Sequence, residues 1–337
     1  MNANERSGAS GSPRASEPGG VQATSPSRKR LIAIVGPTAT GKSALGVALA
    51  TRFDGEIVSC DSTAVYRDID IGTDKPGPEA RRAVPHHLID VADIRETYSA
   101  ARYAQDAGRA IEDIVQRGRL PILIGGTGFY YRALVRGLFP GPARNDELRE
   151  RLDRVAAVRG VQSLHRWLLR VDPRSAMRIQ PRDRKRLVRA LEVYLLTGLP
   201  LTDHFAQTTS PIAGYEIVPV GLTLPRRLLR ERVAARVDDQ FARGVVREVQ
   251  DLFSQGVPAS AHALGGLVYR QVVEMLQGAR DEAATRALIV RENMRYAKRQ
   301  MIWFKREAGI RWIAGAGETS DAQREASRIV EDWLATT

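Results

Sequence analysis

A phosphate-binding pattern constrains the fold of this chain more than any other feature. The pattern is G-x-x-x-x-G-K-[ST], and its residues are Gly36, Pro37, Thr38, Ala39, Thr40, Gly41, Lys42 and Ser43. In such a loop the glycines let backbone amides surround a phosphate at a helix N-terminus, the lysine adds a charge, and the serine can ligate Mg²⁺. The apolar run at 31–35 predicts a buried strand before the loop, and 43–52 predicts a helix after it. We therefore expect a di- or triphosphate site between a strand and a helix.

Strands and helices continue to alternate along the chain. Short apolar runs at 56–60 and 120–124 are typical of buried strands, and 99–117 shows helical spacing. After a break at 140–142 the pattern is helical from 146 to 197, and 215–222 predicts a returning strand. Long helices are expected at 226–255 and 281–306. This order predicts an α/β fold, a P-loop NTPase-like core of three layers with a parallel sheet, interrupted by a helical insertion domain.

The inserted helical segment carries most of the excess positive charge. The chain has 51 Lys and Arg against 39 Asp and Glu, a net charge of +12. Between residues 144 and 189 there are 14 Lys and Arg against 6 Asp and Glu, an excess of 8. Positive charge concentrated in this way indicates a polyanionic partner, with nucleic acid as the first candidate.

Composition also predicts the organisation of the chain. Residues 1–29 are poor in large apolar side chains and are expected to be a disordered tail. We expect the α/β core at 30–140 and 213–315, the basic helical insertion at 141–212, and a C-terminal helix or tail at 316–337. The single cysteine excludes a disulfide scaffold, no apolar run is long enough to span a membrane, and no secretory signal is visible. A monomeric cytoplasmic protein without a membrane partner is expected.

The phosphate loop alone does not identify whose phosphate it holds. A nucleotide-hydrolysing protein of this class needs a carboxylate after a buried strand, yet the strand at 120–124 ends in Gly125 and Gly126. Asp61 directly follows the strand at 56–60, at the edge where parallel sheets bind ligands. Asp61 is therefore a candidate base or orienting group for a nucleophile. An outer contact to Mg²⁺ and a turn cap are the alternatives.

Six segments of the chain form an ordered set. They are the phosphate loop; DSTAVYR at 61–67 with DIGTDKP at 70–76; VPHHLID at 84–90 with YSA at 98–100; GGTGFY at 125–130; RALEVY at 189–194 with TG at 197–198; and AKRQ at 297–300 with WF at 303–304. In this order they resemble the tRNA dimethylallyltransferases, also called tRNA isopentenylpyrophosphate transferases. The resemblance extends from about residue 31 to residue 312, and its specificity comes from the set rather than from any one motif.

The resemblance implies a reaction and the residues that serve it. A dimethylallyl group would pass from dimethylallyl diphosphate to N6 of adenosine-37, the base on the 3′ side of the anticodon in tRNA. The phosphate loop would then hold the diphosphate with Mg²⁺ as cofactor and Ser43 as the metal contact. Asp61 would orient the amine and take its proton, and Thr38 would be a second catalytic contact. The target base would be flipped out of the anticodon loop into a channel that opens at both ends.

Positions that contact tRNA are also implied by the resemblance. They are Asp61, Ser62, Thr63, Ala64 and Thr127 beside the channel, and Lys185, Arg186, Leu187, Val188 and Arg189 in the insertion. A helix is expected to begin at 183, with Arg186 and Arg189 on one face that either binds RNA or is simply solvated. Three aromatic residues either line the channel or belong to the core, namely Phe129, Tyr130 and Tyr131. One of Arg232 and Arg236 could reach the diphosphate, and the sequence does not select between them.

Some positions depart from the family pattern. Thr63 and Ala64 stand where many members have Met-Gln, so an RNA contact through that glutamine is lost or replaced. The usual Gly-Tyr-Arg-Gln segment reads Val-Tyr-Arg-Gln at 268–271, so Val268 replaces its glycine. The usual Asn-Asp-Pro-Gln-Arg segment reads RDRKR at 182–186. The phosphate loop and Asp61 keep the family pattern.

Other functions account for part of these observations. An ATP-dependent nucleotide or small-molecule kinase explains the phosphate loop and Asp61, but it does not need the basic insertion. The same insertion argues against an adenylate isopentenyltransferase acting on free AMP. An RNA-binding protein switched by nucleotide would need a carboxylate at the end of a third strand, and the sequence offers no good candidate.

Overall fold

A six-stranded sheet forms the centre of the computed structural model, which describes residues 29–139, 141–206 and 208–336. The strand order is β3-β2-β4-β1-β5-β6, and every neighbouring pair is parallel. The strands are β1 (Lys29–Val35), β2 (Gly55–Cys60), β3 (His86–His87), β4 (Leu120–Gly125), β5 (Tyr215–Thr223) and β6 (Arg311–Ala314). The predicted α/β class with a parallel sheet is confirmed.

The middle of the sheet explains the apolar run in the sequence. β1 lies between β4 and β5, with Ile32 opposite Ile122 on one side and Val218 on the other. Helices cover both faces, so Leu31 to Val35 are all buried. A strand covered on both faces is apolar at every position rather than at every second one. The carboxyl end of β1 then leads directly into the phosphate loop.

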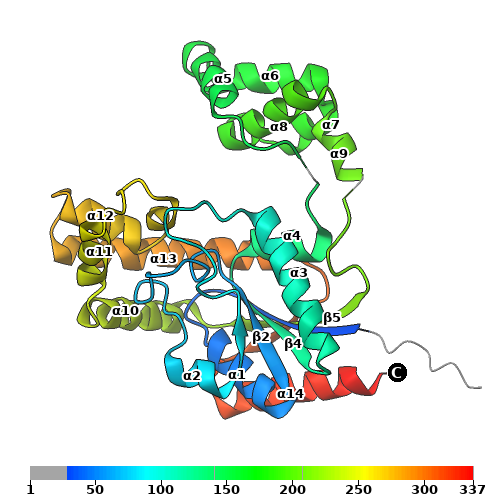
Figure 1. The fold of residues 1–337 in the computed structure, drawn as a ribbon, viewed down its shortest axis with the longest axis vertical. Coiled ribbons are helices and arrows are strands. Elements are labelled where there is room, and N and C mark those ends of the chain that lie inside the picture. Colours follow the sequence, from blue (N-terminus) through cyan, green and yellow to red (C-terminus); the bar gives the residue numbers. More distant parts are fainter. Residues whose placement is uncertain (1–28, 140, 207, 337) are drawn as a thin grey trace, which may run out of the picture.

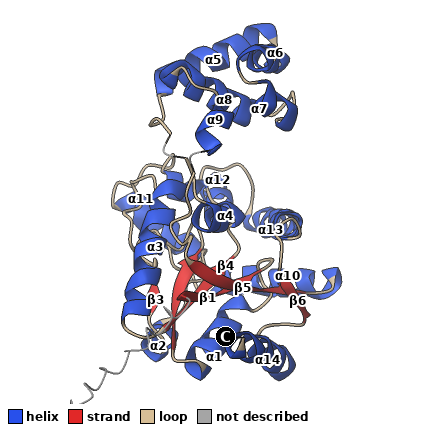
Figure 2. Cartoon of the chain, turned by 90° about the vertical axis from the view of Figure 1, so that its right-hand side faces the viewer, coloured by secondary structure: helices blue, strands red, loops and turns tan. Residues whose placement is uncertain are grey.

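A different set of helices covers each face of the sheet (Figures 1 and 2). One face packs against α1 (Lys42–Arg52) and α14 (Ser320–Ala335). The other packs against α3 (Ala100–Gln116) and α4 (Gly128–Arg136), with the C-terminal helices continuing the same core. Those helices are α10 (Arg226–Ala242), α11 (Val245–Ser254), η1 (His262–Gly265), α12 (Tyr269–Leu276) and α13 (Glu282–Phe304). A short helix, α2 (Pro78–Ala83), lies between β2 and β3.

Five helices between α4 and β5 build a separate body, here called the helical module. They are α5 (Asp146–Arg159), α6 (Val161–Val171), α7 (Pro173–Arg178), α8 (Arg184–Thr197) and α9 (Leu201–Ala206). The module has its own apolar cluster, with Leu164, Leu168, Leu187 and Leu191 fully buried. Figure 1 shows it set apart from the sheet and joined to it by two chain segments.

The structure differs from the sequence-based expectation in a few elements. The single helix expected at 226–255 is two helices, because Gly244 adopts φ +94° between α10 and α11. The short edge strands β3 and β6 were not predicted. Of the predicted tail at 1–29, all but Lys29 lies outside the described residues, and Lys29 begins β1. Within the described ranges, no helix combines the length and the apolar character needed to cross a membrane.

Candidate active site

Two glycines shape the phosphate loop between β1 and α1. Gly36 adopts φ +133°, and a Cβ there would lie 2.6 Å from the carbonyl oxygen of Leu222. Gly41 adopts φ +84°, and a Cβ there would lie 2.6 Å from the amide nitrogen of Gly317. Glycine is the residue that tolerates both the angles and the close contacts. The backbone can therefore wrap around an anion just before the N-terminus of α1.

The Lys42 side chain folds back over this loop. Its Nζ donates to the carbonyl oxygen of Pro37 at 2.6 Å, and the Thr40 hydroxyl donates to the same oxygen at 2.9 Å. Burial lowers the pKa of Lys42 to about 8, and the positive charge of Arg236 contributes to the decrease. An anion bound at the loop would raise the pKa of Lys42 again, because a nearby opposite charge favours the protonated form.

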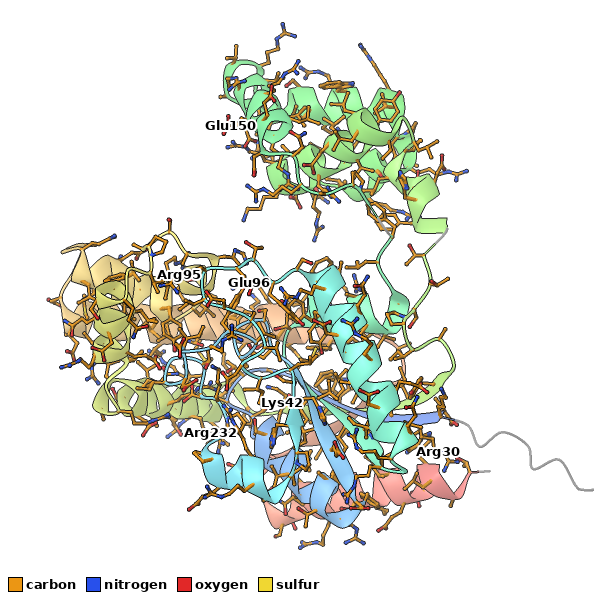
Figure 3. All side chains as sticks on the ribbon, in the orientation of Figure 1. Arg30, Lys42, Arg95, Glu96, Glu150 and Arg232 are labelled. Carbon is orange, nitrogen blue, oxygen red and sulfur yellow. The ribbon has the colours of Figure 1, made fainter. Side chains whose placement is uncertain are left out.

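Two arginines of α10 also contact the phosphate loop. Arg232 Nε donates to the carbonyl oxygen of Ala39 at 2.7 Å, and its guanidinium pairs with Glu318 at 2.5 Å. Arg236 donates to the hydroxyl of Thr38 at 3.1 Å and forms an ion pair with Asp74. Lys42 and Arg232, both labelled in Figure 3, line one further cavity beside the loop.

Asp61 stands at the carboxyl end of β2, directly after Cys60. Its Oδ1 accepts three hydrogen bonds, from the Thr63 amide at 2.8 Å, the Thr63 hydroxyl at 2.7 Å and the Ala64 amide at 3.4 Å. None of the described residues donates to Oδ2. The carboxylate thus has one oxygen held by the protein and one available to a ligand.

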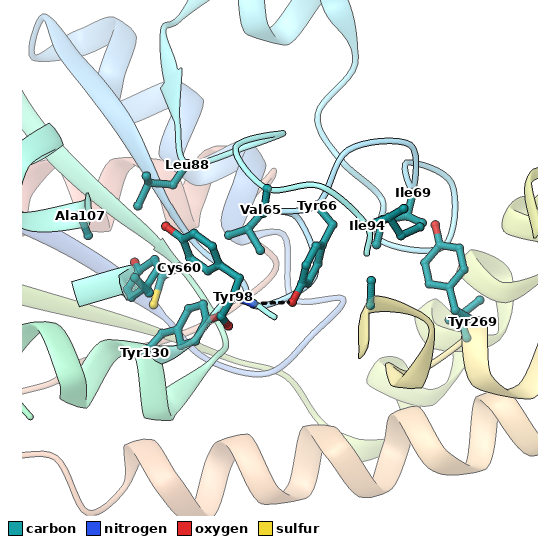
Figure 4. Packing of buried hydrophobic residues seen from close by; sticks show 14 of the residues in the cluster. Cys60, Val65, Tyr66, Ile69, Leu88, Ile94, Tyr98, Ala107, Tyr130 and Tyr269 are labelled. Atoms are coloured by element: carbon teal, nitrogen blue, oxygen red, sulfur yellow. Dashed lines mark hydrogen bonds between the residues drawn. The ribbon is translucent and has the colours of Figure 1, made fainter. Parts of the chain in front are cut away.

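Buried core residues hold the segment that carries Asp61 in place. Val65 and Tyr66 are fully buried, and the Tyr98 amide donates to the Tyr66 hydroxyl oxygen at 3.0 Å (Figure 4). From the side, the Thr127 hydroxyl accepts a bond from the Ser62 amide at 3.1 Å. The backbone around Asp61 is therefore fixed by contacts with other parts of the chain.

Two adjoining cavities meet at Asp61. The first, here called the loop-side cavity, has a volume of about 140 Å³ and is lined by Lys42 and Ser43 among others. The second, here called the outer cavity, has a volume of about 270 Å³ and is lined by Ser62 and Thr63 among others. Both cavities are lined by Thr38, Asp61, Thr73, Arg236 and Tyr296. An anion at the loop and a second reactant in the outer cavity would meet beside the Asp61 carboxylate.

The structure gathers one group of the predicted site residues and separates another. The phosphate loop, Asp61 to Ala64 and Thr127 lie together around the two cavities. The five residues at 185–189 lie on α8 in the helical module. Of these, Lys185 and Arg186 are exposed, whereas Leu187 and Val188 are buried in the apolar cluster of the module.

Arg189 is half-buried and paired within the module, unlike the exposed Arg186. It donates to Glu192 at 2.7 Å and to the carbonyl oxygen of Pro142 at 3.1 Å. Glu192 is fully buried and also accepts two bonds from Arg149 at 2.8 Å each. The hydrogen bonds from Arg149 and Arg189 lower the pKa of Glu192 to about 2, although burial alone would raise it. This network ties the first and fourth helices of the module to the incoming chain.

The three aromatic candidates differ in their burial. Tyr130 and Tyr131 are buried in the core, and Phe129 is 51% exposed. None of the three lines either cavity. The aromatic side chain that lines both is Tyr296 on α13, which the sequence analysis did not select. Burial raises the pKa of Tyr296 to about 12, so its hydroxyl keeps its proton.

Asp74 is a second site residue that sequence reasoning missed. It accepts hydrogen bonds from Arg236 and from Gln240, and it lines the loop-side cavity. Burial raises the pKa of its carboxyl group, and Arg236 opposes that increase. Its position within the segment at 70–76 was a signal, but nothing in the sequence linked it to α10.

Comparisons with known proteins point to one family. The sequence model of the IPP transferases matches residues 64–307. A tRNA dimethylallyltransferase of Koribacter versatilis (strain Ellin345) is 44% identical over 305 residues, which is 89% of this chain and 98% of that protein. A tRNA dimethylallyltransferase of Thermomicrobium roseum (strain ATCC 27502 / DSM 5159 / P-2) is 48% identical over 288 residues, covering 85% and 86%.

Solved structures give the same result for the fold. The full-length tRNA isopentenylpyrophosphate transferase of Bacillus halodurans superposes with a TM-score of 0.66 at 35% identity, over 90% of this chain and 97% of that one. A eukaryotic dimethylallyltransferase acting on tRNA superposes with a TM-score of 0.78 at 27% identity, over 91% and 80%.

Proposed function

This chain belongs to the IPP transferase family of prenyl-transferring enzymes, and from that premise we propose the reaction that it catalyses. It transfers the dimethylallyl group of dimethylallyl diphosphate to N6 of adenosine-37, 3′ of the anticodon, in tRNA. The products are N6-(dimethylallyl)adenosine and diphosphate. The observation that carries the proposal is the position of Asp61 between a cavity at the phosphate loop and a cavity open to a second substrate.

The loop-side cavity holds the diphosphate of the donor. The loop amides, Lys42 and Arg236 supply positive charge where the leaving group gains negative charge, and such fixed donors stabilise the transition state. The carbon–oxygen bond of the donor breaks toward this charge. Of the two arginines left open by the sequence, we propose Arg236, since it lines both cavities and contacts Thr38.

Asp61 serves the acceptor. The amine of adenine is a weak nucleophile, and a positioned carboxylate assists by orienting it and accepting its proton. We propose that Oδ2 takes the proton as N6 bonds to the first carbon of the dimethylallyl group, while Oδ1 stays bound to the protein. Thr38 lies between the two reactants, as a residue that lines both cavities.

We propose Mg²⁺ as the cofactor of the diphosphate site. Within the part of the chain that the structure describes, no group of three His, Cys, Asp or Glu could hold a metal ion. The hydroxyl of Ser43, which lines the loop-side cavity, fits a cation bound mainly by the oxygens of the substrate and by water, as Mg²⁺ prefers. When bound, the ion neutralises charge on the departing diphosphate.

We propose that tRNA binds between the outer cavity and the helical module. Asp61, Ser62 and Thr63 line the outer cavity, where the extruded base would enter, and Ala64 and Thr127 lie beside them. Lys185 and Arg186 offer exposed charge on α8 of the helical module. The target base must leave the stacked anticodon loop to reach Asp61, as in other enzymes that modify bases. The monomeric state and the cytoplasmic location stay predictions.

The kinase alternative lacks comparable support. The relatives and the solved structures are prenyl transferases of tRNA, and they support the prenyl reaction over phosphoryl transfer. The strand β4 ends at Gly125 and is followed by Gly126, so no carboxylate stands there for a nucleotide-bound metal.

The test is a reaction with purified components. Incubation with unmodified tRNA, dimethylallyl diphosphate and Mg²⁺, followed by mass analysis of the nucleosides, should yield N6-(dimethylallyl)adenosine as the new nucleoside. Asp61→Asn keeps the size of the side chain but removes the proton acceptor, so turnover should fall by roughly 10²–10⁴ while both substrates still bind. Phosphoryl transfer from ATP to a nucleotide without prenylation of tRNA would contradict the proposal.

A further inference from the structure

We propose that the hydroxyl of Thr63 is a positioning group for Asp61, a role that rests on the proposed function and adds a residue to it. The family resemblance implies that Thr63 contacts tRNA. The structure gives its hydroxyl a different partner, since Oγ1 donates to Asp61 Oδ1 at 2.7 Å. A group that holds one carboxylate oxygen leaves the other oxygen in a defined direction for the amine.

Of the three hydrogen bonds to Oδ1, the side-chain bond depends on the residue type at position 63. The other two donors are the backbone amides of Thr63 and Ala64, which many residues could supply in the same turn. A side chain without a donor at this position would leave Asp61 Oδ1 with the two backbone hydrogen bonds alone.

A loop across the outer cavity fixes the orientation of Thr63. A Cβ at Gly266 would lie 3.2 Å from the Thr63 methyl carbon, so this methyl group packs against the loop that follows η1. Threonine is branched at Cβ and stiff about χ1, so holding the methyl group also holds the hydroxyl. The methyl faces Gly266 and the hydroxyl faces Asp61.

The loop itself adopts a costly conformation at the same place. Val268 has φ +74°, which is rare for a β-branched residue and persists only where the surroundings enforce it. Val268 lines the outer cavity together with Gly266 and Thr63. The strained residue and the side chain that donates to Asp61 therefore lie in one wall of the outer cavity.

The first experiment compares Thr63→Val and Thr63→Ser in single-turnover prenylation at saturating tRNA and dimethylallyl diphosphate. Thr63→Val keeps the shape but removes the donor, and the rate should fall roughly tenfold, as for the loss of a hydrogen bond to a charged group. Thr63→Ser keeps the hydroxyl but lacks the methyl group that orients it, so its rate should lie between those of Thr63→Val and the wild type, nearer to the wild type. The dissociation constant for tRNA should change less than twofold. Thr51→Val on the exposed side of α1 is the matched control.

Two double variants separate positioning from a general structural effect. In the Asp61→Asn background, Thr63→Val should cause no further loss, because the carboxylate that it orients is gone. Gly266→Ala should slow the wild-type enzyme by pressing on the Thr63 methyl group. The same change should cost little beside Thr63→Ser, which lacks that methyl group. Thermal melting shows that each variant is folded.

Three results would overturn the role of Thr63. They are a wild-type rate for Thr63→Val, an equal loss in the Asp61→Asn background, and a loss of tRNA affinity with an unchanged rate at saturation. The last result would return Thr63 to RNA binding. A wild-type protein that yields no prenylated tRNA would instead overturn the proposed function itself.

Discussion

The backbone N–H of Thr38 donates to Gln300 Oε1 at 2.8 Å, so a side chain of α13 fixes the phosphate loop across 262 positions of sequence. The other end of the same amide donates to the carbonyl oxygen of Gly126 at 2.9 Å. Gly126 precedes Thr127, which holds the Ser62 amide beside Asp61. One buried glutamine therefore links the loop proposed for the donor with the segment proposed for the acceptor.

Gln300→Leu should lower both stability and rate. Thr38 N–H and Gly126 C=O would each lose a partner, and the free energy of unfolding should fall by about 1–3 kcal/mol for each buried group left unpaired. The single-turnover rate should fall as well, because the side chain that joins the two loops is gone. Urea unfolding measures the first effect, with Gln116→Leu on exposed α3 surface as the control. Equal unfolding midpoints for Gln300→Leu and Gln116→Leu would contradict this prediction.

Arg236→Gln should raise the KM for dimethylallyl diphosphate more than Arg232→Gln does. Arg236 lines both cavities beside Asp61. Arg232 lines neither of these two; it shares a further cavity at the loop with Arg236 and is paired with Glu318. Removal of a charge-assisted hydrogen bond to the diphosphate corresponds to a change of roughly tenfold or more. For Arg232→Gln we expect the KM to change less than about threefold, because the bond from Arg236 to the diphosphate stays in place. Steady-state kinetics with varied donor at saturating tRNA measures both, and the reverse order would assign the diphosphate to Arg232.

The parts of the site that sequence predicted are those fixed by local pattern. The loop at 36–43 is a contiguous motif, and Asp61 follows a strand whose carboxyl end meets that loop in any parallel sheet. Gln300, Tyr296 and Asp74 could not be assigned, because their roles depend on where α13 and α10 pack. The break at Gly244 was also missed, since one glycine within a helical pattern is often tolerated.

The ionisation of Glu192 should make the stability of the folded protein depend on pH. Its folded pKa of about 2 lies below its ordinary value of 4.5, so this contribution to stability is complete above 4.5 and is lost as pH falls toward 2. Glu192→Gln removes the charge and should lower the melting temperature at pH 7, because Arg149 and Arg189 lose their shared partner. The difference between wild type and variant should shrink between about pH 5 and about pH 2. A difference that stays constant over this range would contradict the assignment of the low pKa.

Charge removal on α8 should separate residues that bind RNA from those that hold the module together. Lys185 and Arg186 are exposed, and Arg186 has a partner in Asp183 only at 3.5 Å. Lys185→Gln with Arg186→Gln should weaken tRNA binding and reduce the slope of log K against log salt by about one for each phosphate that the variant no longer neutralises. The KM for the donor should not change, because the phosphate loop is untouched.

Arg189→Gln is the contrasting variant. Its guanidinium is bound to buried Glu192 and to Pro142, so its loss should lower the melting temperature. Below that temperature the salt slope for tRNA should match the wild type, because Arg189 holds the module together and does not bind phosphate. Filter binding of tRNA from low to high salt, together with thermal melting, gives both quantities for each variant. A salt slope that falls for Arg189→Gln but not for the Lys185–Arg186 pair would move the RNA contact to Arg189, and it would refute this division.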